Sequence, residues 1–238
     1  MKDISLVSLC VMLLPVALVG FFYWKWIGKA GEIPMAALRM VSQLLLVGYI
    51  LNTLFANNRL EVALGILIFM IAVSSVIAAR SHSRKTWANY RRIMISIFIG
   101  GSLNLALVML VVVRPEPLYE LKTLIPLAGM IYSNAMNAIS LGGERFWKQI
   151  DSGSEYTEAR AESFRASLIP QMNSFLAVGL VSLPGMMTGQ VLSGVSPLIA
   201  VRYQIMVMCM VMGTSGISVI IYLLLCSGRF PHKKGARQ

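Results

Sequence analysis

The stretch GGERFWKQIDSGSEYTEARAESFRASLIPQ, residues 142–171, is a polar segment between two long apolar runs of the chain. The other connections between apolar runs are short, so this segment is where the chain should have most contact with water. It leads directly into NSFLAVGLVSLPGMMTGQ (173–190), an apolar run that contains the pair Pro184-Gly185. This order predicts a water-exposed docking segment joined to a broken membrane-spanning helix.

The composition is typical of an all-α polytopic membrane protein. Apolar residues make up 57% of the chain, and the mean hydropathy is +0.71. A helix needs about 20 apolar residues to cross the hydrocarbon core, and seven runs qualify: 4–24, 34–55, 62–79, 93–113, 123–141, 173–192 and 198–226. The first run ends in the aromatic cluster FFYWKW and is too long for a signal peptide, so we expect a retained span. We predict a single transmembrane domain over 1–238, with 142–171 as its cytoplasmic coupling segment.

Charges in the loops predict the orientation of the chain. With Arg39 and Arg202 inside spans left aside, fifteen Lys and Arg residues fall on one side of the predicted spans and four on the other. Lys and Arg accumulate in cytoplasmic loops, so we expect the N-terminus outside, the C-terminus inside and 142–171 in the cytoplasm. The same bias accounts for the net charge of +11 without a nucleic-acid partner. The basic stretch HSRKTWANYRR (82–92) is interpreted as a topogenic cluster that touches anionic lipid heads, with a cytosolic partner as the alternative.

The sequence lacks the common motifs of catalysis and metal binding. Three cysteines lie inside apolar runs, which argues against a disulfide framework. There is no metal-ligand spacing, no Gly-x-Ser-x-Gly elbow and no Gly-rich phosphate loop ending in Gly-Lys-Ser/Thr. We therefore expect no enzyme active site and no cofactor bound by this chain. Sixteen methionines, among them Met186 and Met187, leave a soft-metal site open, although packing in the membrane core is the simpler interpretation.

The polar segment contains a predicted helix over Glu155–Leu168, introduced by the turn residues Asp-Ser-Gly-Ser at 151–154. At helical spacing its aromatic residues share one stripe and its charged residues another. An amphipathic helix that ends in a membrane span suits contact with a cytosolic partner, and a solvated helix packed on its own domain is the alternative. The candidate coupling residues are Phe146, Trp147, Tyr156, Glu158, Arg160, Glu162, Phe164 and Arg165.

A second set of candidates lies in the apolar runs. Pro184-Gly185 interrupts a predicted span, and Gly185 and Gly189 are four residues apart, a spacing that lets another helix approach closely. Amides at membrane depth line a cavity or bond between helices as structural glue. A packing kink and structural amides are the plainer alternatives. The candidate pathway or gating residues are Asn134, Asn137, Pro184, Gly185, Met186, Met187, Thr188, Gly189 and Gln190.

These stretches resemble the FetB-type iron-export ABC transporter permeases, which are related to plant permease-like proteins of aluminium tolerance. The resemblance is carried by GMIYSNAMNAISL (129–141), by SLIPQMNSFLAVGLVSLPGMMTGQVLSG (167–194) and by PLIAVRYQIMVM (197–208). The block Leu-Pro-Gly-Met-Met-Thr-Gly-Gln is its most specific part.

The resemblance implies a multi-pass permease of the inner (plasma) membrane that forms a homodimer and exports iron or another metal. It also implies a separate cytosolic ABC ATPase that binds ATP and Mg²⁺. Residues 184–190 would match the core motif of the family, and 158–165 would fall in its coupling region. A secondary transporter or channel without an ATPase is the alternative. That alternative would favour acidic residues inside the membrane, whereas all ten acidic residues lie in loops or near the termini.

Overall fold

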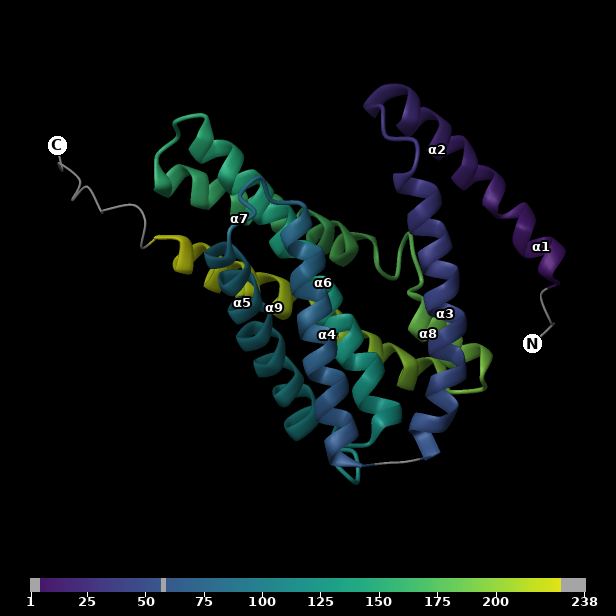
Figure 1. Ribbon diagram of the computed structural model, residues 1–238. Coiled ribbons are helices and arrows are strands. Elements are labelled where there is room, and N and C mark those ends of the chain that lie inside the picture. The colour runs from purple at the N-terminus through teal and green to yellow at the C-terminus, as the bar shows by residue number, and fades with distance from the viewer. Residues whose placement is uncertain (1–4, 57–58, 228–238) are drawn as a thin grey trace. The chain divides into compact units, whose positions relative to one another are not determined.

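The computed structural model describes residues 5–56 and 59–227, and every regular element in these ranges is a helix (Figure 1). The chain divides into two compact units, one up to residue 57 and one from residue 58 onward. Each is described by itself. The prediction of an all-α membrane protein is confirmed, and the prediction of a single domain stays a prediction.

The first unit contains helices α1 (Leu6–Val11), α2 (Leu13–Ile27) and α3 (Glu32–Ala56). Helix α2 ends at Gly28, whose φ of 81° is a left-handed conformation that favours glycine. In the connection to α3, Lys29 Nζ forms an ion pair of 2.9 Å with Glu32 Oε1, in the first turn of α3. Stretches 8–27 and 32–50 are long and apolar enough to cross a membrane.

The second unit is a helical bundle built around α6. Its elements are α4 (Leu60–Arg80), α5 (Trp87–Leu107) with its π-helical continuation η1 (Val108–Val113), α6 (Leu121–Asp151), α7 (Tyr156–Ala177), α8 (Gly185–Leu192) and α9 (Pro197–Ser227). Helix α6 packs against α4, α5, α7 and α9, whereas α8 packs against α9 (Figure 1). Buried small residues allow the close approaches: a Cβ on Gly100 of α5 would lie 2.9 Å from the backbone of Ser218 in α9.

Six helices in the described ranges are long and apolar enough to be membrane spans, and they correspond to six of the seven predicted runs. The remaining predicted span, 173–192, is sixth in chain order and is not one helix. Helix α7 ends at Ala177, residues 178–184 form a turn with an isolated bridge between Val178 and Ser182, and α8 begins at Gly185. The span is therefore broken, as predicted, but Pro184 lies at the N-cap of α8 and not in the middle of a kinked helix.

The polar segment 142–171 is almost entirely helical, well beyond the one helix predicted within it. Helix α6 continues through its first ten residues, and α7 takes up those from Tyr156 onward, so only 152–155 lie outside a helix. The predicted helix over Glu155–Leu168 exists and extends nine residues further, to Ala177. The segment was predicted mainly as a connection between two spans, because composition does not distinguish a loop from the polar ends of long helices.

Part of the charge pattern falls on residues that the structure does not describe. These are Lys2, Arg229, His232, Lys233, Lys234 and Arg237. The predicted orientation of the chain stays a prediction.

Candidate functional site

A cavity of about 530 Å³ lies between α6 and α7, with residues of α4 and α9 completing its wall. Asn134 and Asn137 of α6 and Gln171 of α7 contribute amide groups to its wall. Hydroxyl groups come from residues at the end of α4 and from both α6 and α7, namely Ser81, Ser140, Ser167 and Ser174. The rest of the wall is apolar, with Ile77, Met136, Leu141 and Val211 among its residues, so neutral groups that donate and accept hydrogen bonds are set in a largely apolar surface.

Helical spacing brings these side chains to one place. On α6, residues 134, 137 and 141 recur every three or four positions, and on α7, residues 167, 170, 171 and 174 do the same. Next to the cavity the two helices approach closely, because a Cβ on Gly142 would lie 3.2 Å from the Cβ of Ser167. The buried stripe of α7 is Ala159, Ser163, Ser167 and Gln171, one residue per turn. This stripe was not predicted, because it consists of small and neutral residues, whereas the aromatic and charged residues of α7 lie on its other faces.

Hydrogen bonding in the cavity is incomplete. Asn134 donates from Nδ2 to the Met130 carbonyl at 2.8 Å, and its Oδ1 accepts from Gln171 Nε2 at 3.4 Å. Gln171 is buried, and its Oε1 has no hydrogen-bond partner within the described ranges. Buried acceptors are normally satisfied, so this oxygen is a candidate for contact with a bound molecule. Pro170 adjoins it inside α7 and cannot donate the usual helical hydrogen bond to the Ala166 carbonyl.

Two of the candidate pathway residues in 184–190 line a different cavity. Pro184 and Met187 contact a space of about 350 Å³ against α9, together with Met208 and Cys209. Gly185 and Gly189 face open space, with no atom within 4 Å of their Cβ positions. Met186 is half-buried, and the Thr188 hydroxyl donates to the Pro184 carbonyl at 3.1 Å. Gln190 has a buried Oε1 without a hydrogen-bond partner in the described part of the chain. Of the nine candidate pathway residues, two therefore line each cavity and the other five line neither.

The candidate coupling residues also divide into two groups. Phe146 and Trp147 are 0% exposed, so the expectation that they face a partner or the membrane interface is wrong. They point inward because α6 is a continuous helix here and its buried face runs through Gly142, Gly143 and these two rings. Glu158, Arg160 and Arg165 are exposed, and Tyr156, Glu162 and Phe164 are half-buried.

Trp147 belongs to a buried hydrogen-bond network between the α4–α5 connection, α6 and α9. Trp147 Nε1 donates to the Tyr222 hydroxyl at 2.9 Å, and that hydroxyl donates to Asn89 Oδ1 at 2.8 Å. Asn89 Nδ2 lies 3.0 Å from His82 Nδ1, and His82 Nε2 lies 3.1 Å from the Ile139 carbonyl. Since a carbonyl only accepts, Nε2 carries the proton and Nδ1 accepts from Asn89.

This network holds His82 as a neutral imidazole. Burial lowers the pKa of His82 below its ordinary value, against the smaller opposing effects of the Ile139 carbonyl and the Glu144 carboxylate. The ring lies against Gly143, where a Cβ would come within 2.2 Å of it. From the sequence His82 was expected in a basic loop. The network was not predicted, because the side chains of His82, Asn89, Trp147 and Tyr222 are up to 140 positions apart in the chain.

The helices of the second unit and the cavity between α6 and α7 define a polytopic, all-helical membrane protein with a hydrogen-bonding chamber inside its bundle. The model of a family described as an uncharacterised protein family, UPF0014, matches residues 5–230. The chain belongs to this family.

Its relatives come from bacteria and plants. The UPF0014 membrane protein slr1647 of Synechocystis is 32% identical over 86% of this chain and 85% of the relative. A protein of Escherichia coli named "Probable iron export permease protein FetB" is 32% identical over 81% and 78%. The Arabidopsis protein named ALUMINUM SENSITIVE 3 is 29% identical over 92% and 83%. No solved structure matches the chain. The resemblance described above is confirmed at the level of the family.

Proposed function

We propose that the chain is the membrane-spanning permease subunit of an ABC transporter that exports a metal cargo. The name of the Escherichia coli relative supports export of iron. The chain would act as a homodimer in the inner (plasma) membrane, with its N-terminus outside and its C-terminus in the cytoplasm. ATP and Mg²⁺ would be bound by a separate cytosolic ATPase.

One observation carries this proposal. Helix α7 is a single helix whose first half presents Glu158, Arg160 and Arg165 to solvent and whose second half contributes Gln171 to the cavity. A partner that grips the charged half would therefore move a wall of the cavity. A transport cycle requires that kind of link between two states, because nucleotide can shift the permease only through contacts that differ between them.

The lining of the cavity favours a cargo that keeps its own ligands. Amides and hydroxyls would bond to the water or chelator around a metal ion. Direct coordination is less favoured, because the described residues include no group of three or more His, Cys, Asp or Glu side chains that could hold a metal. The specificity of the cavity would then depend on the shape and hydrogen bonds of a hydrated or chelated ion.

The test is reconstitution of the full chain with a candidate cytosolic ABC ATPase from the same organism, sought first among the neighbouring genes. We expect capture of that ATPase and nucleotide-dependent movement of iron across the vesicle membrane. Arg165→Glu on the exposed face of α7 should reduce capture and transport together. Lys122→Glu at the first turn of α6, the opposite end from Asp151, is the matched control and should change neither. Transport without any ATPase would support the secondary-transporter alternative instead.

A further inference from the structure

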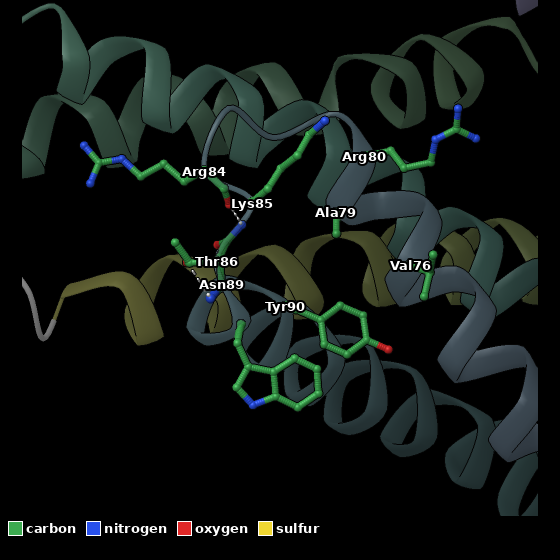
Figure 2. Close-up of a pocket in the computed structure, with 9 residues that line it drawn as sticks. Val76, Ala79, Arg80, Arg84, Lys85, Thr86, Asn89 and Tyr90 are labelled. Carbon is green, nitrogen blue, oxygen red and sulfur yellow. Dashed lines mark hydrogen bonds between the residues drawn. The ribbon is translucent and has the colours of Figure 1, made fainter.

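A third cavity, of about 620 Å³, lies where α4 ends and α5 begins (Figure 2). Its walls are Val76, Ala79 and Arg80 of α4, the connecting residues Arg84, Lys85 and Thr86, and Trp87, Asn89 and Tyr90 of α5. None of the candidate pathway or coupling residues belongs to it. The cavity therefore requires an explanation of its own.

Two positive charges at this cavity are unpaired. Arg80 and Lys85 are exposed, and within the described ranges neither forms an ion pair. Arg84 differs, since its Nη2 lies 2.9 Å from Asp151 Oδ1 and its guanidinium lies 4.5 Å from the centre of the Trp147 ring. Figure 2 shows the Arg84 side chain directed away from those of Arg80 and Lys85.

The first turn of α5 adds to the positive potential. Thr86 caps this helix by accepting the Asn89 backbone N–H at 3.3 Å. The N–H groups of the two residues between them have no partner inside the helix, and the N-terminus of a 21-residue helix carries partial positive charge. Backbone and side chains thus favour an anion at the same place.

The remaining wall of the cavity is apolar and accessible. The Trp87 side chain is 71% exposed and stacks on Tyr90 with ring centres 5.2 Å apart, and Val76 on α4 is 53% exposed. Both helices are candidate membrane spans, so these side chains extend from the charged end of the cavity toward the hydrocarbon core. An exposed Trp at the end of a span is typical of the membrane interface.

We propose that this cavity binds one anionic phospholipid of the surrounding bilayer. The headgroup phosphate lies between Arg80 and Lys85, and an acyl chain lies along Val76, Tyr90 and Trp87. A free phosphate would satisfy the cations but would leave the apolar wall uncovered. A zwitterionic lipid brings a cation of its own close to the two basic side chains. The match of an anionic head to two cations and of a chain to an apolar wall therefore selects an acidic lipid.

The bound lipid stabilises the connection between α4 and α5. Asn89 lines the cavity, donates from Nδ2 to the Arg84 carbonyl at 3.1 Å and takes part in the network with His82 and Tyr222. A ligand that holds Lys85 and the first turn of α5 also restrains Asn89. Occupancy should therefore appear as increased thermal stability as well as binding.

The test uses the full chain purified in detergent and compares phosphatidylglycerol with phosphatidylcholine. Native mass spectrometry should show one retained phosphatidylglycerol per chain, and its addition should raise the melting temperature. Each basic residue near an anionic lipid contributes about a fivefold change in affinity, so Arg80→Gln with Lys85→Gln should weaken retention roughly twenty-five-fold. The control pair, Arg145→Gln with Lys148→Gln, removes two exposed charges from α6 and should retain the lipid.

Three results would overturn the proposal. They are equal retention of both lipids, equal loss in the control pair, and stabilisation by inorganic phosphate as large as that by phosphatidylglycerol. The last result would assign the cavity to a soluble phosphate. Should the double variant prove unstable, Arg80→Lys with Lys85→Arg keeps the charge and must retain the lipid, while Trp87→Ala must weaken retention without loss of charge. The assay measures no transport, so its outcome is independent of the proposed function.

Discussion

At the scale of single residues, the Tyr222 hydroxyl is the central atom of the buried network. It accepts from Trp147 Nε1 and donates to Asn89 Oδ1, and so connects α9 to α6 and α5. All the groups involved are buried. Loss of this oxygen leaves one donor and one acceptor unsatisfied, and that costs more than the loss of an exposed hydrogen bond.

We therefore expect Tyr222→Phe to lower the free energy of unfolding by about 1–3 kcal/mol. The matched control is Tyr203→Phe in the same helix, because its exposed hydroxyl makes no hydrogen bond within the described part of the chain. Thermal unfolding in detergent, followed by tryptophan fluorescence, measures both variants. Equal midpoints would show that the network contributes little to stability.

A pH dependence follows from the neutral state of His82. Its pKa is lowered in the folded chain, so the unfolded chain binds more protons between the folded pKa and the ordinary value of about 6.5. Stability should therefore be complete above about pH 6.5 and decline as the pH falls through that value toward the folded pKa. Besides Glu144, the charged side chains closest to this network in the described part of the chain include Arg84 and Arg92.

The chain has two histidines, which provides a matched pair of variants. When the pH is lowered from 7.5 to 5.5, the melting temperatures of the wild type and of His232→Gln should decrease. The melting temperature of His82→Gln should decrease less. His232 lies outside the described residues and serves as the control. The same decline in all three proteins would assign the effect to carboxyl groups and not to His82.

At the scale of helices, the contact between α6 and α7 depends on the absence of a side chain at residue 142. A Cβ there would lie 3.2 Å from the Ser167 Cβ and 3.3 Å from a methyl group of Val219. Gly142→Val adds two further carbons and should separate the helices at a cost of about 1–3 kcal/mol. It should also reduce transport, because Gln171 would move away from Asn134.

The control is Gly129→Val on the same helix. There a Cβ meets only the flexible end of Met70, at 3.5 Å. Unfolding in detergent and vesicle transport are both measured. If the two valine variants behave alike, the close approach at Gly142 does not determine the geometry of the cavity.

Helices were predictable from the sequence, but the contacts between them were not. Long apolar runs correspond to the six helices that are long and apolar enough to cross a membrane, although α6 continues past its predicted run as polar helix. Asn134 was predicted as a cavity residue from its polarity at membrane depth. Gln171 was not, because it lies at the edge of the polar segment, and its burial depends on Gly142 and Ser167 meeting across two helices. Phe146 and Trp147 were placed on the surface because local composition does not reveal which face a neighbouring helix covers.

At the scale of the whole molecule, the proposed homodimer has a candidate contact on α8. Gly185 and Gly189 lie one turn apart with no atom within 4 Å of either Cβ position. A small-residue face of this kind lets a second helix approach closely in a membrane. Within the second unit α8 packs against α9, and we propose that its glycine face contacts a second copy.

We expect Gly185→Leu to leave the chain folded and still able to capture its ATPase, but to convert the dimer to monomer and abolish transport. Gly65→Leu is the matched control, since Gly65 is also an exposed glycine inside a helix with open space around it. Mass photometry in nanodiscs reports the oligomeric state. Dimers of the Gly185 variant with wild-type transport would remove α8 from the interface.

Pro170 has a consequence for how the molecule could move. A helix bends most readily where its ladder of hydrogen bonds is interrupted, and in α7 that interruption adjoins Gln171 at the wall of the cavity. Pro170 is therefore the position at which we expect α7 to bend, between its charged half and the segment that leads to α8. With such a bend, a force on the charged half of α7 would change the width of the cavity. Helix α6 would stay in place, because it packs against four helices.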